Sequence, residues 1–308
     1  MKHKIGIPRA LLYHKYHFFW EEFLRSLGQE VVVSPETNRE IIGRGVNLAV
    51  DESCLSVKIY LGHVDYLKDK VDFVFIPRVV SLYKKENLCV KFMALNDIVR
   101  NTFDGIKILE YTTHVPTFRY DFIGLFGVGW QLTHNPFLVL RAIARAKKTQ
   151  RQQLKRLLLE QEMRLKGSDK NLKILIVAHP YTTYDSFLGI PITSFLEKQG
   201  VELVFADLAD EKETRELSKN ISTDLYWTYN KELVGALEKY RKEVAGVIFI
   251  MTFPCGPDSL VIDLCQNKVN DLPIVVITLD ELQGEAGLKT RLESFVDILK
   301  IRNERGVH

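Results

Sequence analysis

The sequence predicts an α/β protein built from two Rossmann-like domains with parallel sheets, joined by a helical connector. A length of 308 residues exceeds the need of one doubly wound unit and suits two separate cores. Apolar residues switch repeatedly between a period of 2 and a period of 3.6, as they do where strands and helices alternate in a parallel sheet. A wholly helical, cation-rich stretch separates two such alternating regions.

The first predicted domain, residues 1–132, alternates short apolar strands with amphipathic helices. Helices are expected over residues 11–27 and from about residues 38 and 51. Strands are expected at residues 4–7, 30–34, 73–76 and 107–109.

The predicted connector, residues 133–170, is strongly basic. Between Arg141 and Lys166 it carries nine basic and two acidic residues, which leaves the rest of the chain at about −4. A solvated helix face is the plain interpretation. Docking of a partner, binding of CoA phosphates and contact with nucleic acid are the alternatives, of which nucleic acid is the least expected.

The second predicted domain, residues 171–308, repeats the alternation of the first. The segments VDFVFIPRVV and VAGVIFIMTFPC, each an apolar strand leading into a Pro-containing loop before a cysteine, fit an ancient duplication. Helices are expected at residues 189–199, 232–242, 258–267 and 288–300, and strands at residues 173–178, 202–206, 246–251 and 274–278.

The composition predicts a soluble protein of the cytoplasm with no membrane role. No apolar run approaches the roughly 18 residues that a membrane-spanning helix needs. The first residues lead directly into a strand and lack the apolar core and small-residue cleavage site of a signal peptide. Four cysteines in a reducing compartment are poor candidates for disulfides, so they are core thiols, nucleophiles or metal ligands.

Three of the cysteines occupy turn or cap positions. Cys54 is expected in the first turn of a helix that Asp51 or Ser53 caps. Cys255 follows an all-apolar strand and precedes a Gly-Pro-Asp helix start. Cys89 ends a loop long enough to return its sulfur to the same edge of the first sheet. These positions favour a shared metal site, with unreactive thiols in a metal-free binding protein as the plain alternative.

Cys265 differs because it lies within the predicted helix DSLVIDLCQNK, roughly 15 Å along the axis from Cys255, and is expected in the core. A structural zinc site is disfavoured, since no pair of cysteines has the C-x₂₋₄-C spacing. Single thiolates from separate loops instead suit an iron–sulfur cluster in the interdomain cleft, where helix-end N–H groups offset its negative charge.

Several stretches resemble a known family along the whole chain: IGIPRALLYHKY, SPETNREIIGRGVNLAVDESCLSVKIYLGHV, FIPRVVS followed by LCVKF, MTFPCGPDSL, and LDELQGEAGLKTRLESFVDIL. The family is that of 2-hydroxyacyl-CoA dehydratase-type proteins associated with CoA-substrate-specific activases, specifically a domain of unknown function fused to, or encoded beside, the activase. The sequence departs from the family's pattern at Ser56 and Val90, where proline is expected, and at Leu282, where histidine is expected.

The resemblance implies a 4Fe-4S cluster on Cys54, Cys89 and Cys255. It implies an ATP-hydrolysing activase, itself an iron–sulfur protein, as the source of low-potential electrons. The implied activity is reduction or dehydration of a small molecule or acyl-CoA at an open iron, and the alternative is an electron relay or cluster scaffold without turnover. The resemblance leaves a homodimer open.

Other polar residues are weaker candidates for chemistry. His63 and His179 lie near the ends of predicted elements and are able to donate protons near neutral pH, although such histidines are more often structural. Asp51 and Glu52 precede Cys54, and Glu285 lies in a GEAG turn. None of the five is assigned a catalytic role.

Overall fold

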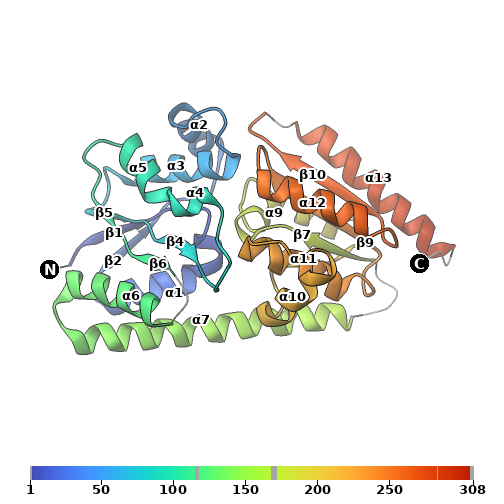
Figure 1. The fold of residues 1–308 in the computed structure, drawn as a ribbon. Coiled ribbons are helices and arrows are strands. Elements are labelled where there is room, and N and C mark those ends of the chain that lie inside the picture. The colour runs from blue at the N-terminus through green and yellow to red at the C-terminus, as the bar shows by residue number, and fades with distance from the viewer. Residues whose placement is uncertain (1, 115–117, 168–171, 283, 306–308) are drawn as a thin grey trace. The chain divides into compact units, whose positions relative to one another are not determined.

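The computed structural model describes residues 2–114, 118–167, 172–282 and 284–305 and contains two compact α/β units (Figure 1). The first unit is Met1–Lys155 with Tyr226–Thr228, and the second is Arg156–Leu225 with Tyr229–His308. Both have parallel sheets, which confirms the predicted fold class. The predicted boundaries, residues 1–132, 133–170 and 171–308, stay predictions, and the boundary residues 1, 170, 171 and 308 lie outside the described residues.

The main sheet of the first unit has the strand order β2-β1-β3-β5, and every pair in it is parallel. A separate parallel pair joins β4 to β6. The strands are β1 (Lys4–Ile7), β2 (Glu30–Val33), β3 (Phe73–Phe75), β4 (Arg78–Ser81), β5 (Ile108–Leu109) and β6 (Thr112–His114). The helices are α1 (Tyr13–Ser26), α2 (Arg39–Leu48), α3 (Leu55–Leu67), α4 (Val90–Met93), α5 (Leu95–Thr102) and α6 (Phe118–Thr133).

The sheet of the second unit has the order β8-β7-β9-β10, again with every pair parallel. Its strands are β7 (Lys173–Val177), β8 (Glu202–Phe205), β9 (Gly246–Thr252) and β10 (Ile274–Leu279). Its helices are α8 (Pro180–Thr183), α9 (Gly189–Lys198), α10 (Glu211–Leu217), the 3₁₀ turn Ser218–Asn220, α11 (Thr228–Tyr240), α12 (Gly256–Lys268) and α13 (Glu285–Glu304).

The two main sheets share one topology. In each, the first strand along the chain lies between the second and the third, and the fourth lies outside the third. The third strands are β3 and β9, which belong to the two segments that suggested a duplication. In this topology the connections from the first and third strands leave the carboxyl edge in opposite directions, which makes that edge a favoured place for ligands.

Helix α7 (Pro136–Leu165) is the predicted basic helix, and residues from its two halves pack on different units. In the first unit, Gln150 Nε2 donates a hydrogen bond of 3.1 Å to the Lys15 carbonyl oxygen. In the second unit, Gln161 Nε2 donates to the carbonyl oxygens of Phe205 and Leu208, at 2.7 and 2.8 Å. These part-buried amide contacts tie each half of the helix to its own unit.

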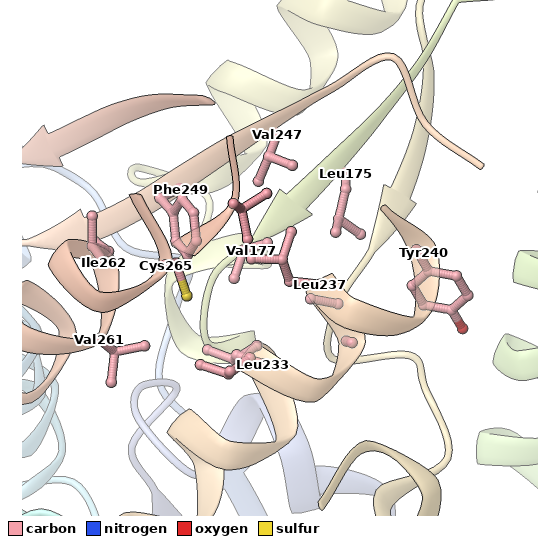
Figure 2. Packing of buried hydrophobic residues seen from close by; sticks show 14 of the residues in the cluster. Leu175, Val177, Leu233, Leu237, Tyr240, Val247, Phe249, Val261, Ile262 and Cys265 are labelled. Atoms are coloured by element: carbon pink, nitrogen blue, oxygen red, sulfur yellow. The ribbon is translucent and has the colours of Figure 1, made fainter. Parts of the chain in front are cut away.

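One core cluster of the second unit lies between the sheet and the helices α11 and α12 (Figure 2). All residues of β7 and β9 are buried, as expected for strands covered on both faces. Leu233 and Leu237 pack from α11, and Val261 and Cys265 pack from α12. Cys265 is fully buried, which confirms its predicted place in the core.

Two glycines let α2 and α3 approach each other at backbone distance. A Cβ atom at Gly45 would clash with the carbonyl oxygen of Lys58, and one at Gly62 with the carbonyl oxygen of Ile41. Arg44 and Asp65 add an ion pair of 2.8 Å between the same helices. This tight pair holds the helix that starts after Cys54.

Candidate functional site

Cys54, Cys89 and Cys255 share one local structure, the N-cap of a helix. They precede α3, α4 and α12, and their ψ angles of 150°, 143° and 105° are extended. None of the three side chains caps its own helix. A thiol beside the first N–H groups of a longer helix, as at α3 and α12, is favoured as a thiolate by the partial positive charge there.

The predicted capping of the Cys54 helix is wrong in one respect. Helix α3 begins at Leu55, so Cys54 is itself the N-cap and lies just before the first turn. Its carbonyl oxygen accepts hydrogen bonds from the amides of Val57 and Lys58, at 2.9 and 3.1 Å. Neither Asp51 nor Ser53, the two predicted caps, is therefore the N-cap of this helix. Asp51 and Glu52 are exposed in the preceding turn.

The loop before Cys89 is fixed by a short parallel pairing. The Asn87 amide donates to the carbonyl oxygen of Tyr226 at 2.9 Å, and the Thr228 amide donates to the Asn87 carbonyl oxygen at 3.2 Å. The Leu88 amide bonds back to the Val80 carbonyl oxygen of β4 at 2.9 Å. Cys89 therefore stands one residue beyond an ordered anchor.

Cys255 is accompanied by a buried polar network within the second unit. Asp258, in the first turn of α12, has one carboxylate oxygen 2.9 Å from His179 Nε2 and 2.8 Å from Asn230 Nδ2. Burial alone would raise the pKa of the Asp258 carboxyl. The charge of His179 and hydrogen bonds from His179, Asn230 and Cys255 outweigh that effect and lower the pKa.

His179 lies at the carboxyl end of β7, as predicted, and is buried. Its ring stacks on Tyr181 with 4.9 Å between ring centroids. The Nδ1 atom is buried and has no hydrogen-bond partner among the residues that the structure describes. His179 thus combines an oriented Nε2 atom with a second nitrogen that is able to bond a small molecule.

His63 is a structural residue rather than a proton donor. It is fully buried near the end of α3, and its Nε2 atom lies 3.0 Å from the Thr37 hydroxyl. Burial, together with the charges of His14 and Arg9, lowers the pKa of His63 to about 3. The ring is therefore neutral at physiological pH.

Two polar side chains that follow β1 along the chain, Arg9 and His14, were not among the predicted site residues. Arg9 Nε and His14 Nε2 are buried without a hydrogen-bond partner in the described part of the chain. The Arg9 amide donates to Ser34 Oγ at 2.8 Å, which ties the ends of β1 and β2 together. Arg9 lies two residues after β1, and His179 lies two residues after β7. This matching position after the first strand of each unit could have marked Arg9 as a candidate site residue.

The remaining candidates are peripheral. Leu282, at the position where the resemblance expects histidine, is 90% exposed. Glu285 is the first residue of α13, and its side chain lies outside the described part of the structure. Among residues 2–114, 118–167, 172–282 and 284–305, none of the helices combines the length and the hydropathy that a membrane span requires.

The described side chains include no group of three or more His, Cys, Asp or Glu residues arranged to hold a metal ion. Cys54 and Cys89 belong to the first unit and Cys255 to the second. A centre that uses all three draws on both units and therefore stays a prediction. All four cysteines are free of disulfides.

Together these features define an α/β protein of two Rossmann-like units whose half-buried cysteines stand at helix N-caps. The chain belongs to the family described as the CoA enzyme activase uncharacterised domain (DUF2229), whose model matches residues 4–208. The matched region contains Cys54 and Cys89 and ends before Cys255. The activase-associated part of the resemblance is thereby confirmed.

No curated protein matches the chain. Among solved structures, the binding protein FpvC of Pseudomonas aeruginosa in complex with Mn²⁺ matches with a TM-score of 0.32 and 11% identity, over 99% of this chain and 100% of that one. A mutant of the laminin-binding adhesin Lmb of Streptococcus agalactiae matches with a TM-score of 0.30 and 11% identity, over 97% and 99%. Likeness at this level carries no argument about function.

Proposed function

We propose that this chain is a cytoplasmic iron–sulfur protein that receives electrons from an ATP-hydrolysing CoA enzyme activase. The observation that carries the proposal is the shared N-cap position of Cys54, Cys89 and Cys255. Half-buried thiols at element ends suit iron ligation, whereas Cys265 is buried inside α12, where burial and then the charge of Glu238 raise the pKa of its thiol to about 12. The four cysteines thus divide into three candidate ligands and one core residue.

The donor set fits a 4Fe-4S cluster with one iron not held by cysteine. Thiolates are the usual ligands of such clusters, and helix-end N–H groups at α3 and α12 offset negative charge. When bound, the cluster would supply one-electron reduction of a small molecule or an acyl-CoA thioester, in the manner of 2-hydroxyacyl-CoA dehydratases. The chain itself would contribute the three sulfurs. Cys255 would lose its hydrogen bond to Asp258 on becoming a thiolate, and His179 and Asn230 would continue to hold the Asp258 carboxylate.

A second candidate function is an electron relay or cluster scaffold without substrate turnover. The observation that favours it is Leu282, which stands exposed where the resemblance expects a histidine. Electron paramagnetic resonance of the reduced protein, with and without cyanide or acyl-CoA, separates the two functions. A spectrum that changes with added ligand supports an open iron, and a spectrum unmoved by either ligand supports the relay.

The primary test is anaerobic purification followed by iron and sulfide analysis. We expect a brown protein with about equal iron and acid-labile sulfide that bleaches in air. Cys54→Ala, Cys89→Ala and Cys255→Ala should each lower the iron content, and Cys265→Ala is the matched control that should keep it. A colourless wild-type protein, or equal iron loss in all four variants, contradicts the proposal.

A further inference from the structure

A pocket of about 310 Å³ lies at the amino ends of β9 and β10 in the second unit. Its walls are the segments that enter these two strands and the last turns of α13. Cys255 follows the carboxyl end of β9, at the opposite edge of the sheet. The pocket is therefore separate from the candidate thiol site, and its volume is near the lower limit for small-molecule sites, roughly 300 Å³.

One part of the pocket wall is apolar. Leu299 is 1% exposed and Val244 is 8% exposed, so both belong to the core. Leu272 and Pro273 continue this surface toward solvent and are half-buried. A ligand in the pocket would thus have an apolar surface on one side.

The rim of the pocket carries more positive than negative charge. Its lining includes Arg241, Lys242 and Arg302, against the single carboxylate of Asp271. Arg241 already bonds Glu238 at 2.9 Å and lies 3.8 Å from Asp271. Lys242 and Arg302 form no hydrogen bond or ion pair with any described residue. Two cations therefore remain available to an anion.

Helix periodicity explains why Arg302 faces the pocket. Leu292, Val296 and Leu299 form the buried stripe of α13, each with 1% exposure. Arg302 follows Leu299 by three residues and so continues the same face. It is half-buried, although it is a cation without an ion pair in the described chain. An unpaired half-buried guanidinium is a suitable partner for a phosphate, which it can bond through two N–H groups.

The first unit provides an internal comparison. A pocket of about 240 Å³ lies at the amino ends of β3 and β5, the strands equivalent to β9 and β10. Its lining includes Asp69, Asp72 and Asp104 but only Lys68 and Lys107 as cations. The shared fold therefore accounts for a pocket at the amino ends of the third and fourth strands of each sheet. It does not account for the excess of positive charge around the pocket of the second unit.

We propose that the pocket at the amino ends of β9 and β10 binds a small organic phosphate. The phosphate would lie between Lys242 and Arg302, whose two charges match a dianion, and the organic part would lie against the half-buried Leu272 and Pro273. Asp271, which also lines the pocket, would disfavour a ligand with a second anionic group. This binding does not depend on iron or on any of the cysteines.

Titration calorimetry of the full-length chain at low ionic strength tests the proposal, with AMP as the probe. We expect AMP to bind, and adenosine and inorganic phosphate each to bind at least about tenfold more weakly, because each lacks one half of the interaction. Arg302→Gln and Lys242→Gln should each weaken AMP binding by about tenfold. Arg305→Gln, three residues further along the chain and outside the pocket, and Lys268→Gln are the matched controls.

Several outcomes would overturn the proposal. The first is that AMP does not bind. The second is that adenosine or inorganic phosphate binds as tightly as AMP. The third is that Arg302→Gln and Arg305→Gln weaken AMP binding equally. The last outcome would mean that surface charge alone attracts the nucleotide. Circular dichroism and the unfolding midpoint of each variant establish that any loss of binding is not a loss of fold.

Discussion

The His179 Nε2 atom lies 2.9 Å from the Asp258 Oδ1 atom, and this contact joins residues 79 positions apart in the sequence. His179 follows β7 and Asp258 follows β9, so the pair ties together the carboxyl ends of the first and third strands of the second unit. Asn230 bonds the same oxygen at 2.8 Å. The buried side chains of His179 and Asn230 thus hold Asp258, and with it the first turn of α12 directly after Cys255.

Asp258→Ala should destabilise the second unit by about 3 kcal/mol, because it leaves His179 and Asn230 buried without their acceptor. Urea unfolding followed by circular dichroism measures the change. Asp263→Ala, on the exposed face of the same helix, is the control and should change the free energy of unfolding by less than about 0.5 kcal/mol. Equal effects of the two substitutions would show that the network contributes nothing specific.

Gly45→Ala and Gly62→Ala should each be strongly destabilising, by about 3 kcal/mol or more, since the added methyl group meets a backbone carbonyl of the partner helix. The same substitutions should reduce iron binding if Cys54 is a ligand, because they displace α3. Gly43→Ala is the matched control in α2. Its new Cβ atom meets open space, and the higher helix propensity of alanine should stabilise the protein by about 0.5 to 1 kcal/mol.

The stability of the first unit should fall on the acidic side of neutrality through His63. Its pKa in the folded state is about 3, below the ordinary value of 6.5, so the unfolded chain binds a proton that the folded chain does not. Stability is therefore full above pH 6.5 and declines as the pH falls from 6.5 toward 3, at up to about 1.4 kcal/mol per pH unit.

His63→Gln should flatten this pH dependence, although the substitution itself costs stability by disturbing a buried site. The measurement is the free energy of unfolding at a series of pH values, compared between the two proteins as a slope and not as an absolute value. Identical slopes between pH 6 and 4 would contradict the assignment.

Cys265→Ala should lower the free energy of unfolding by about 1 kcal/mol, because removal of the sulfur leaves a small cavity between α12 and the sheet. Cys265→Ser should cost more than Cys265→Ala, since it places a hydroxyl group among Phe249, Val261 and Leu233 (Figure 2). Equal stability of the serine and alanine variants would indicate that water or a polar partner reaches this position.

The predictable parts of the fold were those with long or strongly apolar patterns. The strands β7 and β9 were predictable from their continuous apolar runs, whose residues are all buried in the structure. The helices α9, α12 and α13 were predictable from their apolar periodicity. Strands β4 and β6 were missed. RVVS directly follows Pro77, which indicated a loop after β3, and TTH has no apolar residue to mark a strand. Helix α6 was missed because its three glycines, at residues 124, 127 and 129, are typical of turns.

The candidate site was predictable only where neighbours in sequence define it. Cys255 and its helix start could be read from CGPD, and Cys54 was placed one residue too far into its helix. The link from Asp258 to His179 and Asn230 depends on which strands lie side by side, and one sequence does not report strand order. The same holds for Arg9, whose partner Ser34 lies at the end of a neighbouring strand.

The pairing of Asn87 with Tyr226–Thr228 determines how this protein can be dissected. These three residues belong to the first unit, yet the chain on both sides of them belongs to the second. No single cut therefore yields two complete pieces, and a fragment ending at residue 208, where the family match stops, lacks the backbone partner of the loop that carries Cys89. Expression of either unit alone should begin from a circularly permuted or complemented chain, because the boundary of the homology is not a boundary of folding.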